Sequence, residues 1–168
     1  LPTAPTVSLS PDPAVTSDAL VATANGSSDP DGSGAISYSY QWYEDDVLLS
    51  VSTSASFPSA STSKNRAYKV VVTPTDGRGD GPTGEASITI DNSLPIMDSV
   101  TIHAPEPLTS GSTLSCTATA SDADEEALSL SYVWTNASSA VVLDPGSDDS
   151  TLALTADIVL PQQTITCT

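Results

Sequence analysis

Apolar and polar side chains alternate with a period of two along most of the chain, which is the spacing of half-buried β-strands. The alternation is clearest in residues 20–24, 36–42, 68–72 and 86–90 of the first half, and in residues 114–118, 128–134, 152–154 and 165–167 of the second. Stretches rich in proline, aspartate and glycine separate these runs by about ten residues, as in a β-sandwich. No amphipathic helix of useful length interrupts the pattern. The sequence therefore predicts an all-β fold.

The chain also contains an internal repeat. Leu1-Pro2 recurs as Leu94-Pro95, and the segment at residues 37–42 recurs at residues 129–134. Because the matched segments follow in the same order, we predict two homologous β-sandwich domains, residues 1–93 and 94–168. Thr168 aligns with Val71 of the first repeat. The second sandwich is therefore expected to lack its last strand.

Certain side chains identify individual strands. The second repeat carries, in this order, Cys116, Trp134 and Cys167, and the first carries Ala22, Trp42 and Val70 in the same places. This is the order of core residues on strands B, C and F of an immunoglobulin-like sandwich, in which a tyrosine two residues before the strand F position forms a tyrosine corner. Tyr68 has that position. Cys116 and Cys167 would face each other and form a disulfide, which would indicate an oxidising compartment; the alternative is a pair of free buried thiols.

Further motifs give the chain a family likeness. Ser-Asp-x-Asp occurs at residues 28–31 and 121–124, Ser-x-Ser-Tyr-x-Trp at residues 37–42 and 129–134, and Val-Thr-Pro-Thr-Asp-Gly at residues 72–77. Together they resemble the tandem immunoglobulin-like repeats of large secreted or surface-anchored bacterial proteins, which are similar to cadherin-like and polycystic-kidney-disease-type repeats. The resemblance covers nearly the whole chain. It implies an extracellular stalk, fibre or adhesin, often with calcium at the repeats.

Two explanations remain open for the incomplete second repeat. The sequence is either a window from a longer array, or another subunit supplies the last strand by donor-strand complementation and so builds a fibre. The residues themselves do not separate these explanations.

The carboxylate side chains are the only chemically functional groups that cluster in the sequence. In the first repeat, Asp29 and Asp31 lie between strands B and C, and Asp76 and Asp80 lie between strands F and G. These two loops leave a sandwich at the same end, so the four carboxylates can converge on a Ca²⁺ ion. The alternative is a set of ordinary solvated turns, because aspartate also stabilises turns by itself.

A second calcium site is predicted at the joint between the repeats. Its candidate ligands are Asp91, Asn92, Asp98, Asp122, Asp124 and Glu126. A cation there would neutralise like charges and stiffen the connection, whereas the alternative is simply an acidic surface.

Net charge restricts the partners. The chain has 21 Asp and Glu residues against 4 Lys and Arg residues, which gives a formal net charge of -17. Such a surface repels nucleic acids and anionic lipids, and no apolar run approaches the ~20 residues of a membrane-spanning helix. His103 is the only histidine and has no nucleophile partner in a known motif, so no enzyme is predicted. Asn25 and Asn136 begin glycosylation sequons that matter only in a host that glycosylates them.

We therefore predict an extracellular or cell-surface structural and adhesive module whose partners are neighbouring repeats of the same or identical chains. The alternative is a module that binds a cell-surface protein or a glycan. That alternative requires an exposed aromatic platform, and aromatic residues make up only 5% of the sequence.

Overall fold

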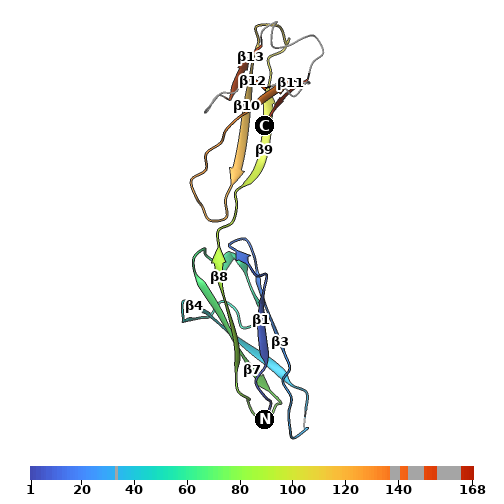
Figure 1. Cartoon of the computed structure of the whole chain (residues 1–168), viewed down its shortest axis with the longest axis vertical. Helices are drawn as coiled ribbons and strands as arrows, with labels where there is room; N and C mark the ends of the chain where they lie inside the picture. The colour runs from blue at the N-terminus through green and yellow to red at the C-terminus, as the bar shows by residue number, and fades with distance from the viewer. Residues whose placement is uncertain (33, 137–140, 144–149, 155–163) are drawn as a thin grey trace. The chain divides into compact units, whose positions relative to one another are not determined.

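The computed structural model of the chain describes residues 1–32, 34–136, 141–143, 150–154 and 164–168. It divides into two compact units, Leu1–Leu94 and Pro95–Thr168, whose boundary lies one residue beyond the boundary that the repeat predicts. Both units are built from strands, and the fold is all-β as the period-two pattern predicts (Figure 1). Among the described residues, no helix has the length and apolar character that a membrane crossing requires.

Unit 1 consists of two sheets that enclose one core. Its strands are β1 (Thr6–Ser10), β2 (Ala14–Val15), β3 (Leu20–Asn25), β4 (Ser37–Glu44), β5 (Val47–Leu49), β6 (Ser56–Phe57), β7 (Ala67–Thr75) and β8 (Gly84–Asp91), and a short 3-10 helix, η1 (Ser59–Ser61), precedes β7. One sheet has the order β1-β3-β6 and the other β2-β8-β7-β4-β5. The first stretch of chain therefore contributes a strand to each sheet, since β1 pairs with β3 and β2 pairs with β8.

The core of unit 1 contains the side chains that the alternation assigns to the inner faces. Trp42 on β4 lies directly opposite Val70 on β7, and both are fully buried. The Trp42 ring stacks at a tilt on Phe57, with the ring centroids 5.1 Å apart, and its indole N–H donates to the carbonyl of Ser54 at 2.9 Å. A large aromatic side chain is thus buried without leaving its polar group unpaired.

Unit 2 repeats this arrangement, with fewer strands in the part of it that the structure describes. Its strands are β9 (Ile96–His103), β10 (Thr113–Ser121), β11 (Trp134–Asn136), β12 (Val141–Leu143), β13 (Thr151–Ala153) and β14 (Ile165–Cys167). One sheet has the order β13-β10-β9 and the other β12-β11-β14. Trp134 lies opposite Cys167, the same relationship that Trp42 has with Val70. The two units therefore share one core pattern.

The strand predicted over residues 128–134 is wrong for most of its length, because β11 begins only at Trp134. In unit 1 the corresponding strand β4 pairs with β7 over eight residue pairs. In unit 2, β11 pairs with β14 over three, and Val133 adds a backbone hydrogen-bond pair with Thr168. Residues 128–132 have no partner strand among the described residues, so alternation alone does not make them a strand.

Candidate functional site

At the end of unit 1 that holds the β3–β4 loop, two predicted calcium ligands, Asp29 and Asp31, lie close to the ammonium group of Leu1. The ammonium group of Leu1 lies 3.4 Å from Asp29 Oδ1 and 3.5 Å from Asp31 Oδ2. The Asp29 side chain is only 4% exposed, whereas that of Asp31 is 77% exposed. Backbone hydrogen bonding fixes this loop, because the N–H of Asp31 donates to Asp29 Oδ1 at 3.1 Å and the N–H of Thr3 donates to the carbonyl of Ser28 at 2.8 Å.

The β7–β8 loop reaches the same end of the unit. A side chain at Gly34 would place its Cβ 3.0 Å from the carbonyl oxygen of Asp76, so the two loops touch through their backbones. Asp76 Oδ1 accepts hydrogen bonds from the backbone N–H groups of Arg78 at 2.8 Å and Gly79 at 3.0 Å. The prediction that these loops share one end is therefore confirmed, but Asp76 uses one of its carboxylate oxygens to hold its own turn.

Electrostatic interactions connect these groups. The N–H donors of Arg78 and Gly79 lower the pKa of Asp76, and the Leu1 ammonium adds to this effect, against partial desolvation and repulsion from Asp29. Desolvation lowers the pKa of the Leu1 ammonium, but attraction and hydrogen bonding to Asp29 and Asp31 outweigh it and raise this pKa above its ordinary value. Asp29, Asp31 and Asp76 thus give this loop end a negative potential.

Asp80, the fourth predicted ligand in unit 1, lies farther along the same loop. It forms an isolated β-bridge with Thr75, at the end of β7. Its backbone pairing closes the loop, and no described contact joins its carboxylate to the pair Asp29 and Asp31. The structure therefore brings together two of the four predicted carboxylates, with Asp76 nearby.

The ligands predicted at the joint belong to different units. In unit 1, Asp91 ends β8 and Asn92 accepts a hydrogen bond from Lys64 Nζ at 3.2 Å. In unit 2, the Ser121 hydroxyl donates to Asp98 Oδ1 at 3.0 Å, which places Asp98 beside the end of β10. The loop that follows contains the remaining candidates, namely Asp122, whose Oδ1 accepts the N–H of Asp124 at 2.7 Å, and Glu126. The joint site itself remains a prediction.

The described side chains provide few ligands for a metal ion. Among the residues that the structure describes, no three His, Cys, Asp or Glu side chains form a group that could hold a metal ion. Ca²⁺ requires six to eight oxygen ligands. The pair Asp29 and Asp31 would supply two carboxylates, so the remaining oxygens would have to come from the loop backbone and from water.

The basic side chains form a second electrostatic feature, which the sequence pattern did not identify. All four Lys and Arg residues of the chain precede residue 79. Arg66 Nη1 lies 2.6 Å from Asp45 Oδ2, and Lys69 pairs with Asp46. Asp45 and Asp46 form the two-residue turn between β4 and β5, and both have positive φ angles, of 46° and 67°, as in a type I′ hairpin. The nearest sequence signal was the Asp-Asp pair between two predicted strands.

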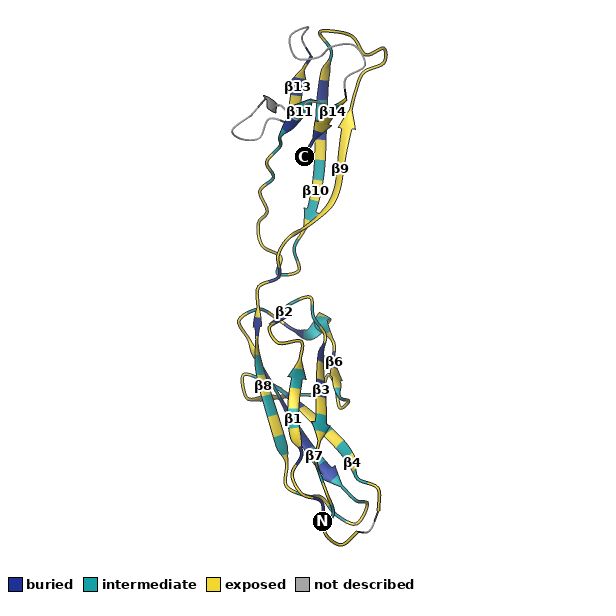
Figure 2. Ribbon diagram, turned by 45° about the vertical axis from the view of Figure 1, so that its right-hand side comes forward, coloured by how far each residue is buried: buried dark blue, intermediate teal, exposed yellow. Residues whose placement is uncertain are grey.

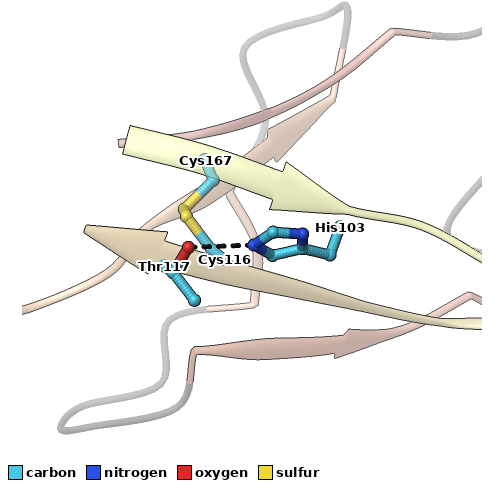
Figure 3. The surroundings of a disulfide bond; sticks show 4 residues. All are labelled: His103, Cys116, Thr117 and Cys167. Atoms are coloured by element: carbon cyan, nitrogen blue, oxygen red, sulfur yellow. Dashed lines mark hydrogen bonds between the residues drawn. A yellow bond between two sulfur atoms is a disulfide. The ribbon is translucent and has the colours of Figure 1, made fainter. Parts of the chain in front are cut away.

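The disulfide predicted between Cys116 and Cys167 is present. It joins β10 of one sheet to β14 of the other across 51 residues, with the Cα atoms 6.5 Å apart (Figure 3). Cys116 and Cys167 are buried, and Trp134 lies in the same cluster. His103 Nε2 forms a 3.0 Å hydrogen bond with Thr117 Oγ1 on the exposed side of β10. The histidine is thus a surface residue of strand β9.

The sequon asparagines both lie at strand ends. Asn25 is the exposed last residue of β3, and Asn136 is the half-buried last residue of β11. Residues 137 and 138, which complete the second sequon, lie outside the described residues.

No family model matches this sequence, and no curated protein matches it at a significant level.

Proposed function

We propose that the chain is a pair of structural repeats that serve as a spacer in an extracellular or cell-surface stalk, fibre or adhesive array. The observation that carries this proposal is the shared core pattern, in which Trp42 opposite Val70 in unit 1 recurs as Trp134 opposite Cys167 in unit 2. Repetition of a unit with its own core is how modular arrays gain length. The family resemblance to tandem immunoglobulin-like repeats of bacterial surface proteins belongs to the same proposal.

The connection between the units supports a spacer. β8 ends at Asp91 and β9 begins at Ile96, so only residues 92–95 join them. Ser93 in this connector is buried within unit 1, where its hydroxyl accepts a hydrogen bond from the backbone N–H of Ser17 at 3.1 Å. A short connector that is anchored by Ser93 at one end and contains the rigid residue Pro95 at the other leaves little free chain between the repeats.

The disulfide supports the proposed location, because such bonds persist in oxidising compartments and are rare in the cytosol.

The aromatic side chains favour a spacer over a glycan-binding module. All eight of them are buried or half-buried, and Trp42, Trp134, Phe57 and Tyr68 are fully buried. A sugar-binding platform requires exposed rings.

Force spectroscopy on the 168-residue chain, held at its two ends, tests the spacer. We expect two discrete unfolding events, because each unit has its own core. With the disulfide intact, the segment between Cys116 and Cys167, which are 51 positions apart, cannot extend. After reduction, the unfolding step of unit 2 should lengthen by about 170 Å. Smooth extension without discrete events would contradict a mechanical role.

Calcium is the second element of the proposal. We propose that Ca²⁺ binds at loop ends such as that of Asp29 and Asp31, two carboxylates that the β3–β4 loop holds at one end of unit 1. Thermal unfolding with CaCl₂ and with EDTA tests this, with MgCl₂ as the control. We expect Ca²⁺ to raise the melting temperature, and the variant with Asp29→Asn and Asp31→Asn to lose part of this rise. An unchanged melting temperature, together with an unchanged small-angle scattering profile, would refute the proposed calcium binding. The spacer role would not be affected by that result, because the force measurement tests it separately.

A further inference from the structure

The β7–β8 loop of unit 1 carries a tripeptide that a spacer role does not use. Residues 78–80 read Arg-Gly-Asp, the tripeptide of integrin-type adhesion ligands. The loop lies at the end of unit 1 where the N-terminus is marked (Figure 2). Arg78 and Asp80 are exposed, whereas Gly79 between them is half-buried. The loop therefore presents one positive and one negative side chain, two positions apart, on its surface.

Two glycines turn the other side of this segment toward the body of the unit. A Cβ atom at Gly79 would lie 2.6 Å from the Leu1 side chain, and a Cβ atom at Gly81 would clash with the carbonyl oxygen of Pro2. Gly81 is the stricter position, because its neighbour is backbone. Since side chains alternate between the two sides of an extended backbone, Asp80, which lies between these glycines, faces away from the N-terminal segment.

Hydrogen bonds hold the backbone of the tripeptide in place. Two of its N–H groups donate to Asp76 Oδ1, and the Thr75 hydroxyl donates to the carbonyl of Gly79 at 3.1 Å. Thr75 also forms the β-bridge with Asp80 that closes the loop. A loop that is ordered in advance loses less conformational entropy when it binds a partner, so this tripeptide is better prepared for binding than the same residues in a flexible tail.

The charges of this loop indicate the chemistry of a partner. Arg78 is the only basic side chain at this end of unit 1, because Lys64, Arg66 and Lys69 lie near the start of β7, at its opposite end. A guanidinium group pairs best with carboxylates, in two parallel hydrogen bonds. A basic side chain beside such an acidic pocket would be neutralised by it, whereas a bound divalent cation can keep an open coordination position for the carboxylate of Asp80.

We propose that the tripeptide of residues 78–80 is a docking site for a cell-surface receptor that holds a divalent cation beside an acidic pocket. One carboxylate oxygen of Asp80 occupies an open position on the Mg²⁺ or Mn²⁺ ion of the receptor, and the Arg78 guanidinium pairs with receptor carboxylates. The inference rests on the proposed function only in placing the chain outside the cell. It requires neither that the chain acts as a spacer nor that the chain itself binds calcium.

Surface plasmon resonance tests this site with the full 168-residue chain, its disulfide intact, over an immobilised integrin ectodomain of the class that binds Arg-Gly-Asp. In MnCl₂ we expect saturable binding that a linear Gly-Arg-Gly-Asp-Ser peptide displaces and that EDTA abolishes. Binding that persists in EDTA, binding that the peptide does not displace, or no binding in MnCl₂ would overturn the proposal.

Two variants of equal charge locate the site. Asp80→Glu keeps the carboxylate but lengthens the side chain by one methylene, which changes its separation from Arg78. Glu85→Asp is the matched control, because it makes the reverse change at an exposed position of β8. We expect Asp80→Glu to weaken receptor binding about tenfold or more and Glu85→Asp to leave it close to the wild type. Both variants are first checked for an unchanged urea midpoint, and equal effects on binding would overturn the assignment.

The position of the cation separates this site from the proposed calcium binding. The variant with Asp29→Asn and Asp31→Asn should bind the receptor as the wild type does, because the cation belongs to the receptor. Loss of receptor binding in this variant, with an unchanged circular dichroism spectrum, would mean that the chain holds the cation, and the proposal would be wrong. None of these measurements involves unfolding under force, so failure of the docking site and failure of the spacer are separate results.

Discussion

The phenolic oxygen of Tyr68 accepts a hydrogen bond from the backbone N–H of Ser63 at 3.1 Å. Its own O–H group lies 3.2 Å from the carbonyl oxygen of Ser61, to which it can donate, and the whole side chain is buried. The tyrosine corner predicted from the spacing of Tyr68 and Val70 is thus confirmed. It ties the turn after η1 to strand β7 and satisfies two backbone groups of that turn.

Replacement of Tyr68 by phenylalanine should destabilise unit 1. The substitution keeps the buried ring and removes both hydrogen bonds, which leaves an N–H and a carbonyl of the turn without this partner. We expect the free energy of unfolding to fall by about 1–3 kcal/mol. Urea unfolding followed by Trp42 fluorescence measures the change, and Tyr38→Phe, whose hydroxyl takes no part in the corner, is the matched control. Equal stability of the two variants would contradict the role assigned to the corner.

Unit 1 should also lose stability in alkaline solution through the same residue. Burial, and then the negative charge of Glu44, raise the pKa of Tyr68. The folded state holds the phenolic proton more tightly than the unfolded chain, in which the pKa is about 10. This stabilisation is complete below pH 10 and is lost as pH rises through the folded-state pKa. Urea midpoints between pH 8 and pH 11 should fall more steeply for the wild type than for Tyr68→Phe; parallel curves would refute this prediction.

Asp76 should make the stability of unit 1 fall as the pH is lowered, which is the opposite of the pH dependence that Tyr68 gives in alkaline solution. The backbone N–H groups of Arg78 and Gly79 lower its pKa, so its contribution is present above about pH 4, the ordinary range of an aspartate, and is lost as pH falls through the lowered value. Asp76→Asn keeps an acceptor oxygen but not the charge. We expect the variant to be less stable than the wild type at pH 6 and equally stable at pH 2, with Asp12→Asn as a control at both values. A stability difference that persists at pH 2 would mean that shape, not charge, fixes this loop.

The sequence was sufficient to predict features that each strand encodes by itself. The inward positions of Trp42 and Trp134 follow from a period of two, and the disulfide follows from two cysteines in phase with the core. Residues 128–132 have the same alternation but are not a strand, because pairing depends on a neighbour that the local pattern does not contain. The ion pair of Arg66 with Asp45 was not predicted for a similar reason, since it depends on a turn geometry that brings together residues 21 positions apart.

The start of β8 depends on the absence of a side chain at Gly84. A Cβ atom there would lie 2.2 Å from the carbonyl oxygen of Pro5, far inside contact distance. Gly84→Ala therefore requires the N-terminal segment or β8 to move, and we expect a loss of about 1–3 kcal/mol in the unfolding free energy of unit 1. Ser87→Ala, on the same strand, is the control. If Gly84→Ala retains wild-type stability, the close approach of these two segments is not required for folding.

Removal of the disulfide should destabilise unit 2 alone. Cys116 and Cys167 are the only cysteines of the chain, and the bond between them closes a loop of 51 residues in the unfolded state. The chain-entropy relation gives a stabilisation of about 4 kcal/mol for such a loop. Differential scanning calorimetry of the double variant Cys116→Ala and Cys167→Ala should therefore show a lower melting temperature for one transition and leave the other unchanged. Tyr68→Phe in the same background should lower the melting temperature only of the transition that removal of the disulfide leaves unchanged. That result assigns this transition to unit 1. If both transitions shift together when the disulfide is removed, the two units do not unfold independently, and the division of the chain into separate cores is wrong in solution.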